Sequence, residues 1–251
     1  MEVAVLGLGE AGGLIAADLV AAGCLVRAWD PVRRRDGVPS AASDLDAVRG
    51  AEVVLSLTTA AHALDAATSV AGELRPDALY ADLNTAAPQL KRELADALPV
   101  QFADVALVGV VPGFGLKIPV LASGTGAERF AELFRPLGMP VEVVGRQAGD
   151  AAGLKLLRSV FMKGIAAAAI EALESAKAAG VESRVHEDIA AVLGEPLLER
   201  LLSGSRTHAA RRVDEMKAAA AYVEELEIDP RIATAAAEWL VQLRDETAPS
   251  P

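Results

Sequence analysis

Three closely spaced glycines near the start of the chain constrain the fold more than any other feature of the sequence. Gly7, Gly9 and Gly12 follow a short apolar run, Val3–Leu6, and precede an apolar helical stretch, Ala11–Ala22. A strand that turns into a helix within a few residues favours glycine, because glycine permits positive φ and a close approach of two backbones. The stretch LGLGEAGG therefore predicts a tight strand–turn–helix unit.

Runs typical of strands and of helices alternate up to about residue 148. We expect strands at 2–6, 25–29, 51–57, 78–82, 101–105, 118–123 and 141–144, and helices at 11–22, 60–71 and 88–97. Such alternation is typical of βαβ units. The sequence thus predicts an α/β, Rossmann-like first domain with a mainly parallel sheet over residues 1–148.

The pattern changes after residue 148, where the strand signals end. Residues 149–179 are apolar on nearly every side, which is typical of a helix buried between domains or subunits. Shorter helical runs follow at 184–193, 196–202, 205–226 and 230–245. We therefore expect a long linking helix and a small all-helical C-terminal domain over 149–251. Because a monomer would expose much of this apolar surface, we also expect a homodimer.

Composition narrows the classes of function. A formal net charge of −11 argues against nucleic acid as a partner. One cysteine, Cys24, excludes an internal disulfide. No uncharged apolar stretch reaches the length of a membrane span, so we expect no membrane contact and a cytoplasmic protein. No cluster has metal-ligand spacing, which predicts no metal, and we expect His62 and His186 at the surface.

The glycine turn fits one class of ligand. Gly7 permits the tight turn, Gly9 lets backbone approach a pyrophosphate, and Gly12 allows the helix to pack closely on the strand. Asp30 ends the second predicted strand, where a carboxylate can accept hydrogen bonds from an adenosine ribose. The alternative is a glycine-rich turn without a ligand. We expect dinucleotide contacts from Gly7, Gly9, Glu10, Ala11, Gly12, Asp30, Arg33, Arg34, Thr58 and Thr59.

Two neighbouring features bear on the choice between NAD and NADP. The carboxylate of Asp30 favours NAD, because it repels a 2′-phosphate. Arg33, Arg34 and Arg35 follow directly and could accommodate that phosphate, unless they form only a solvated turn. We therefore expect NAD or NADP, with NAD slightly favoured.

Two later loops offer groups that suit an acidic substrate. Asn84 and Thr85, in DLNTAAP, follow a predicted strand and precede a helix, so they should lie at the carboxyl end of the sheet. The loop around Gly109 is rich in glycine, and its backbone N–H groups could contact a carboxylate. We expect Asn84, Thr85 and Gly109 to bind a small acid.

Lys155 is unusual because it interrupts an apolar run. Burial there would lower its pKa toward neutrality, which suits a general acid/base, whereas the alternative is a side chain that reaches the surface. Ser159 and Lys163 follow at four-residue intervals and share its helix face. We predict that Lys155 and Ser159 are catalytic. Lys163, about 12 Å from Lys155 along the axis, would bind a distal anionic group or pair with an acid.

A basic trio lies in the C-terminal region. His208, Arg211 and Arg212 have the i, i+3, i+4 spacing of one helix face. We predict that His208 and Arg212 bind a carboxylate or phosphate of the substrate. The alternative is a solvated face in which the trio pairs with Asp214 and Glu215.

Over essentially the whole chain, these motifs resemble the β-hydroxyacid dehydrogenases and 6-phosphogluconate dehydrogenases. The family's GxGxMG is GLGEAG here, its DxST loop is DLNTAAP with Asn84 in place of serine, and its DAPVSGG-like stretch is DVALVGV at 104–110. Gly149 and Lys155 match the family's glycine and catalytic lysine, and Ser159 stands where asparagine is usual. KLLRSVFMKG and THAARRVDEM look like a branch with a short phosphogluconate-dehydrogenase-like helical domain.

The resemblance implies an NAD(P)-dependent oxidoreductase. It would transfer a hydride between nicotinamide and a small β-hydroxy acid or related hydroxy/oxo acid, with Lys155 as general acid/base. Two alternatives stay open. One is an imine reductase on the same fold. The other is a dinucleotide-binding protein without turnover, which the departures at Val108, Val110 and Ser159 would allow.

Overall fold

The computed structural model describes residues 1–109 and 111–247. Val110 of the DVALVGV stretch and residues 248–251 lie outside the described residues. The chain forms two compact units, Met1–Lys155 and Leu156–Pro251. We call them the first and second units. The division lies within one long helix, a few residues after the boundary that the sequence predicts.

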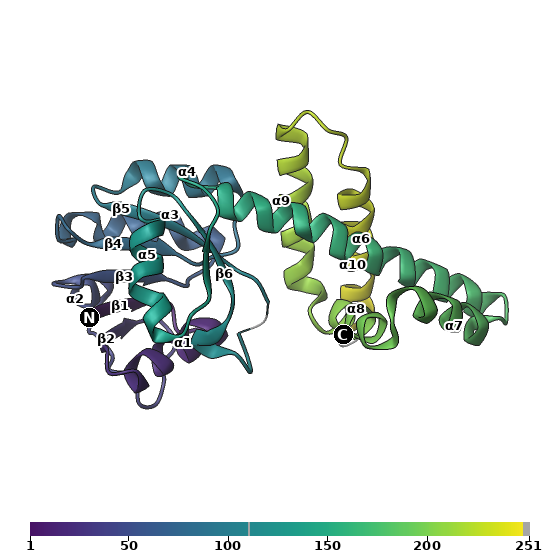
Figure 1. The fold of residues 1–251 in the computed structure, drawn as a ribbon, viewed down its shortest axis with the longest axis horizontal. Coiled ribbons are helices and arrows are strands. Elements are labelled where there is room, and N and C mark those ends of the chain that lie inside the picture. The colour runs from purple at the N-terminus through teal and green to yellow at the C-terminus, as the bar shows by residue number, and fades with distance from the viewer. Residues whose placement is uncertain (110, 248–251) are drawn as a thin grey trace. The chain divides into compact units, whose positions relative to one another are not determined.

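A seven-stranded sheet forms the first unit (Figure 1). Its spatial order is β2-β1-β3-β4-β5-β6-β7. The strands are β1 (Glu2–Leu6), β2 (Leu25–Trp29), β3 (Val53–Ser56), β4 (Leu79–Asp82), β5 (Gln101–Leu107), β6 (Val120–Ser123) and β7 (Val141–Val143). All neighbours pair in parallel except β5 and β6. The predicted Rossmann-like fold with a mainly parallel sheet is confirmed.

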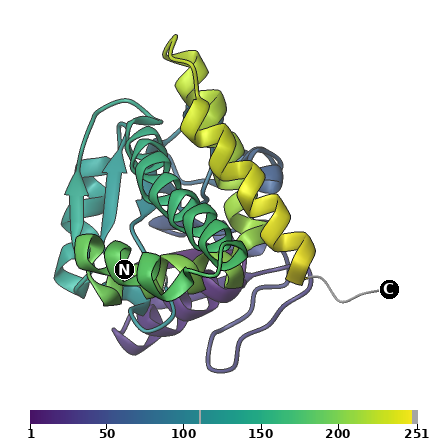
Figure 2. The ribbon, with the colours of Figure 1, turned by 90° about the vertical axis from the view of Figure 1, so that its right-hand side faces the viewer.

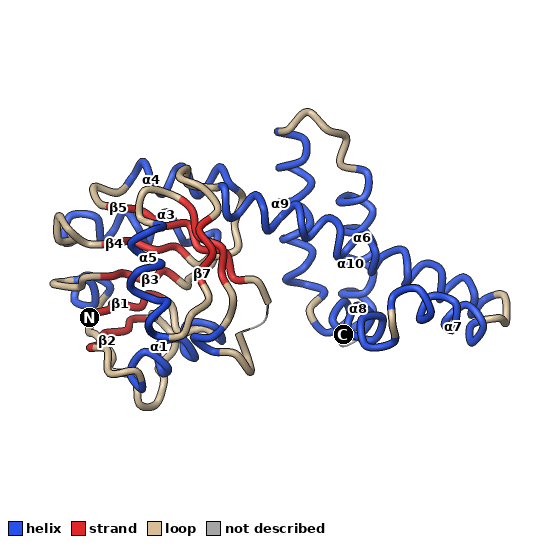
Figure 3. Tube along the Cα trace, viewed as in Figure 1, coloured by secondary structure: helices blue, strands red, loops and turns tan. Residues whose placement is uncertain are grey.

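Helices cover both faces of this sheet (Figure 3). On one face, α1 (Glu10–Ala21) and α5 (Ala127–Phe134) bury Ile15, Leu19, Phe130 and Phe134 in one apolar cluster. On the other face, α2 (Asp44–Val48), α3 (Ala60–Val70) and α4 (Pro88–Ala97) contribute to a second cluster. The short 3-10 helices η1 (Ala71–Glu73), η2 (Gly115–Lys117) and η3 (Arg135–Leu137) lie in the connections.

The structure adds elements that the sequence analysis did not predict. Helix α5 has buried residues at 127, 130, 131 and 134, which is regular helical spacing and was a readable signal. Helix α2 has five residues, too few for periodicity, and begins where the Ser43 hydroxyl accepts the Asp46 N–H. Strand β6 runs antiparallel to β5, and the described residues that connect the two strands contain no α-helix that could cross over the sheet.

The second unit is helical, and its first helix continues from the first unit. Helix α6 spans Asp150–Ala178 and is followed by α7 (Glu182–Leu193), α8 (Glu195–Thr207), α9 (Ala209–Glu225) and α10 (Arg231–Thr247). The helix predicted over 205–226 corresponds to α9 but was placed too early at its start, because α8 extends to Thr207 and His208 is the N-cap of α9. Helices α9 and α10 pack side by side around buried Met216 and Leu240 (Figures 1 and 2).

Candidate active site

The glycine turn between β1 and α1 has no room for larger side chains at two of its three positions. Gly7 has φ +97°, and a Cβ there would lie 2.3 Å from the Leu57 carbonyl oxygen. A Cβ on Gly12 would lie 2.0 Å from the Gly7 oxygen. At Gly9, the N-cap of α1, the nearest atom to such a Cβ is an Arg33 nitrogen at 3.7 Å. The turn is thus closed toward β3 and open at Gly9, as backbone that receives a ligand must be.

Asp30 links this turn to the end of β2. Its carboxylate accepts the N–H of Leu8 at 2.8 Å and those of Val32 and Arg33 at 2.9 and 2.8 Å. Partial burial alone would raise the pKa of Asp30, but these three hydrogen bonds and the charge of Arg33 outweigh it and lower the pKa. Asp30 is therefore an ionised acceptor beside the glycine turn.

The other predicted cofactor contacts lie around the same carboxyl edge of the sheet. Arg34 is exposed, and its guanidinium donates to the carbonyl oxygens of Asp30 and Arg33 at 2.5 and 2.8 Å. Thr58 and Thr59 follow β3, and Thr59 is the N-cap of α3. Glu10 and Ala11 begin α1, with Glu10 exposed and Ala11 half-buried.

Lys155 meets the DLNTAAP loop in the first unit. Its Nζ lies 2.7 Å from Thr85 Oγ1, so the first turns of α6 reach the loop that follows β4. Lys155 is half-buried and Thr85 is exposed. The structure therefore brings together two residues that are 70 positions apart. Gly109 is exposed in the loop after β5, with φ +144°.

Asn84 makes hydrogen bonds that decide how its amide is oriented. Its Nδ2 lies 2.6 Å from Asp82 Oδ1, 3.1 Å from Ser56 Oγ and 3.3 Å from Thr58 Oγ1. The nitrogen must face Asp82, because an amide oxygen that close to a carboxylate would be repelled. The N–H donors of Asn84 are thus directed at protein oxygens.

Buried charges next to this loop escaped the sequence analysis. Asp82, Asp104 and Lys91 are completely buried, and Lys91 Nζ lies 2.6 Å from Asp82 Oδ2 and 3.1 Å from Asp104 Oδ1. Both aspartates are in the motifs quoted above, at strand positions between apolar residues. That placement was a signal for buried carboxylates that need a cation. Nothing in the sequence alone identified Lys91 as that cation.

A second group gathers in the second unit. The Ser159 hydroxyl donates a short hydrogen bond to buried Glu215, and Lys163 Nζ lies 2.9 Å from Glu215 Oε1 and 3.1 Å from Ser159 Oγ. Arg212 is half-buried and donates to Ser205 Oγ at 3.2 Å. Glu215 thus pairs with Lys163 on α6 and also attracts Arg212 of the basic trio, and it does so as a buried carboxylate, not as part of a solvated face.

Positive charge exceeds negative charge in this second group. Burial lowers the pKa of Lys163, Glu215 opposes that effect, and the charges of Arg212 and Arg211 lower the pKa further. Burial likewise lowers the pKa of Arg212, against the attraction of Glu215. Glu215 thus attracts Lys163 and Arg212, Arg211 repels both, and His208 is half-buried at the N-cap of α9. Such an excess of partly desolvated cations favours an anionic ligand.

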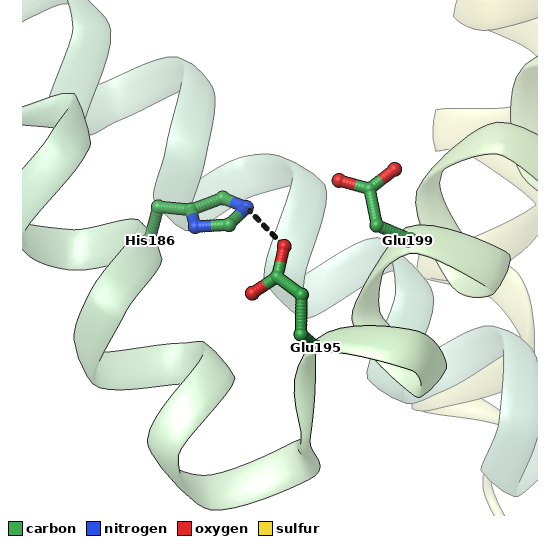
Figure 4. A group of neighbouring side chains, drawn as sticks. All are labelled: His186, Glu195 and Glu199. Atoms are coloured by element: carbon green, nitrogen blue, oxygen red, sulfur yellow. Dashed lines mark ion pairs between the residues drawn. The ribbon is translucent and has the colours of Figure 1, made fainter.

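One further cluster joins residues that the sequence separates. His186 on α7 and Glu195 and Glu199 on α8 have ligand-type atoms within 4.8 Å of one another (Figure 4). His186 Nε2 lies 3.7 Å from Glu195 Oε1. The sequence predicts no metal-ligand cluster, because the turn between α7 and α8 is what brings these three residues together. Both glutamates are exposed, and nothing beyond proximity indicates an ion.

Two known protein families match separate parts of the chain. The NAD-binding domain of 6-phosphogluconate dehydrogenase matches residues 2–114, and a domain of unknown function (DUF1932) matches residues 176–243. The first match contains the glycine turn, Asp30 and the DLNTAAP loop. The second lies in the helical unit and contains His208, Arg212 and Glu215.

Solved structures resemble the whole chain. A conserved hypothetical protein from Sinorhizobium meliloti 1021 is 32% identical, with a TM-score of 0.81 over 99% of this chain and 91% of that one. MTH1747, a conserved protein of unknown function with structural similarity to 3-hydroxyacid dehydrogenases, is 31% identical, with a TM-score of 0.80 over 98% and 97%. The chain belongs to the 3-hydroxyacid and 6-phosphogluconate dehydrogenase superfamily.

A named enzyme shares the fold at lower identity. The 3-hydroxyisobutyrate dehydrogenase of Mycobacterium tuberculosis, solved with L-serine, is 21% identical, with a TM-score of 0.84 over 98% of this chain and 94% of that one. At this identity the likeness shows a common fold. Among the described residues, no helix has the length and apolar character needed to cross a membrane.

The Lys163–Glu215 pair gives a first test. We expect Lys163→Met to lower the free energy of unfolding by about 3 kcal/mol, because Glu215 then stays buried without this ammonium. Adding Glu215→Gln should recover part of the loss. Lys217→Met, on an exposed position of α9, is the control. Urea unfolding followed by circular dichroism measures all four proteins, and a loss below about 1 kcal/mol in Lys163→Met contradicts the prediction.

Proposed function

We propose that the chain is an NAD(P)-dependent oxidoreductase acting on a small β-hydroxy acid or related hydroxy/oxo acid, with Lys155 as general acid/base. The observation that carries this proposal is the contact between Lys155 Nζ and Thr85 Oγ1 at 2.7 Å. It puts an amine beside the loop that ends β4, in the unit that also contains the glycine turn. Ligands of open α/β sheets bind at such carboxyl edges.

The residues of the first unit fit a nicotinamide dinucleotide. Side chains are excluded at Gly7 and Gly12, while Gly9 opens the start of α1 to a pyrophosphate. Asp30 is ionised beside that turn and can accept from a ribose hydroxyl. The nicotinamide, when bound, supplies the hydride acceptor or donor. The remaining chemistry is the movement of one proton and the placement of the substrate.

Lys155 carries the proton step in this proposal. Its Nζ accepts the proton of the substrate hydroxyl during oxidation and returns a proton to the carbonyl oxygen during reduction. The hydroxyl of Thr85 holds Nζ in place. Since Asn84 directs its N–H donors at Asp82, Ser56 and Thr58, we assign it to holding the loop. Thr85 and the backbone N–H groups near Gly109 then bind the substrate carboxylate.

The second unit supplies a separate anion-binding group. Lys163, Arg212 and His208 are proposed contacts for a distal carboxylate or phosphate, which the excess of positive charge supports. Ser159 donates to Glu215, and Glu215 in turn binds Lys163. A catalytic role for Ser159 stays a prediction, and its bonds favour a role in orienting Lys163.

Replacement of Lys155 tests the proton step. With a panel of β-hydroxy acids, oxo acids and cyclic imines, we expect Lys155→Ala to lower kcat about 100-fold or more while the Kd for NADH stays unchanged. Arg158→Ala, exposed on the same helix, is the control and should retain activity. Equal kcat in Lys155→Ala and wild type would contradict the assignment. Turnover of imines alone favours the reductase alternative, and cofactor binding without any turnover favours a non-catalytic protein.

Asp30 gives a test of cofactor choice. We expect Asp30→Asn to weaken NADH binding about tenfold and NADPH binding less, because loss of the carboxylate removes a charged acceptor and also its repulsion of a 2′-phosphate. Arg34→Ala should weaken only NADPH. Nicotinamide fluorescence titrations of wild type and the two variants with both cofactors give the six Kd values. Equal weakening of both cofactors by Asp30→Asn would mean that Asp30 only holds the turn through Leu8.

We also propose that the chain acts as a cytoplasmic homodimer. Leu157 and Phe161, one turn apart on α6, are 41% and 65% exposed, and Ile232 lies against the same helix at Gly164 and is 57% exposed. A second copy that covers this patch would remove apolar surface from water. Sedimentation velocity should show a dimer for wild type and a monomer for Phe161→Glu. A monomeric wild type would contradict the proposal.

A further inference from the structure

We infer that a buried polar network centred on Lys91 is a positioning device for the proposed reaction, because it fixes both the start of α6 and the Asn84–Thr85 loop. The inference rests on the proposed function, since it concerns where Lys155 and Thr85 meet. It assigns a role to Lys91, Asp82 and Asp104, none of which contacts a reacting atom in the proposed mechanism.

The network begins as a row across four strands. Ser56, Asp82, Asp104 and Ser123 are aligned in register on β3, β4, β5 and β6, and each is completely buried. Residues in register on neighbouring strands point to the same face of the sheet. The same face carries Tyr80 and Phe102, two residues earlier on β4 and β5, within an apolar cluster. A polar row in such a core needs internal partners.

Lys91 closes the row from helix α4. Its Nζ donates to Asp82 Oδ2 at 2.6 Å and to the Asp82 carbonyl oxygen at 2.9 Å, and lies 3.1 Å from Asp104 Oδ1. Burial would lower the pKa of Lys91, but the two carboxylates and their hydrogen bonds outweigh burial and raise it. The lysine is therefore cationic, and it holds two aspartates in one place.

Asp104 then extends the network to the first turn of α6. Its Oδ2 accepts the N–H of Gly149 at 3.2 Å and of Ala152 at 2.9 Å. Ser123 Oγ accepts the N–H of Ala151 at 2.9 Å and donates to Asp104 Oδ2 at 3.2 Å. The first N–H groups of a helix have no partner within the helix, and here the sheet provides acceptors for three in this region. Lys155 is three residues after Ala152, on the adjacent turn.

Gly149 permits this close approach. Its φ is +100°, and a Cβ there would lie 2.9 Å from the Pro88 carbonyl oxygen at the start of α4. Helix α6 thus begins directly against the helix that follows the DLNTAAP loop. Gly149, which the family resemblance pairs with Lys155, must therefore be glycine for a steric reason.

Asp82 extends the network in the other direction. Its Oδ1 accepts from Asn84 Nδ2, and Thr85 follows Asn84 and contacts Lys155. The contacts form a closed circuit, from Lys155 through Thr85, Asn84, Asp82, Lys91 and Asp104 back to Ala152 on α6. The buried ammonium of Lys91 fixes both the start of α6 and the Asn84–Thr85 loop. Such a buried charge favours one unique arrangement of these segments more than it adds to the free energy of unfolding. Small errors in such placement slow a reaction strongly.

Asp104→Asn is the central test. It keeps the shape of the side chain but removes the charge, so one amide group must face both Lys91 and the α6 N–H groups. We expect amide exchange at Gly149 and Ala152 to accelerate about tenfold, because these two N–H groups lose a strong acceptor. We expect kcat to fall about 10- to 100-fold with unchanged Kd for NADH. The primary isotope effect with 4-deuterated NADH should rise as hydride transfer becomes slower than the other steps.

Ser123→Ala and Asp96→Asn complete the series. Ser123→Ala removes one acceptor, so it should accelerate amide exchange and lower kcat by smaller factors. If Asp104→Asn does not fold, Ser123→Ala takes its place as the test variant. Asp96→Asn, exposed on α4, should change neither. A folded Asp104→Asn or Ser123→Ala with wild-type exchange, or with wild-type kcat and isotope effect, overturns the inference. If the wild type has no turnover, the proposed function is overturned instead. The exchange data alone then test whether the network holds the start of α6 in place.

Discussion

The interaction on which the first unit depends is the contact of one buried ammonium with two buried carboxylates. Lys91, Asp82 and Asp104 have no exposure to water, so each charge is stable only while the others keep their places. Asp104 also binds the backbone at the start of α6, and Asp82 binds Asn84. The long helix and the substrate loop therefore have one common reference point inside the sheet.

This arrangement separates three tasks among different elements. The glycine turn and Asp30, at β1 and β2, form the part suited to a dinucleotide. The loop after β4 and the start of α6 bring Thr85 and Lys155 together, where we propose the proton step. The helical unit carries the excess cations around Glu215, which suit an anionic group of the substrate. Helix α6 contributes to both units and is the element that links the last two tasks.

The sequence predicted much of the fold because local patterns determine it. Alternating apolar runs marked the seven strands, and the glycine spacing marked the β1–α1 turn. The break at His208 was missed because helical residues continue on both sides of it. The antiparallel direction of β6 goes with a connection whose described residues contain no α-helix, and the composition of that segment does not reveal the strand direction. The helix α5 had a clear periodicity and was simply not predicted.

The candidate site was only partly readable for a related reason. Gly7, Gly12 and Asp30 are near one another in the chain, so their spacing carries the information. The meeting of Lys155 with Thr85 was expected from the resemblance, not from spacing, since 70 positions separate them. Lys91 was unreadable, because a lysine among the charged and polar residues of an amphipathic helix looks like any surface lysine. Only the sheet register, which aligns Asp82 with Asp104, creates the need for its charge.

The most direct test of the account is a titration of the protein with NADH, followed by nicotinamide fluorescence, in wild type and two glycine variants. The account predicts saturable binding to wild type and to Gly72→Ala, where a Cβ meets nothing within 4 Å. It predicts loss of binding in Gly12→Ala, where the Cβ would lie 2.0 Å from the Gly7 oxygen. Absence of binding to wild type with both NADH and NADPH would show that the glycines form only a turn, and would contradict the account.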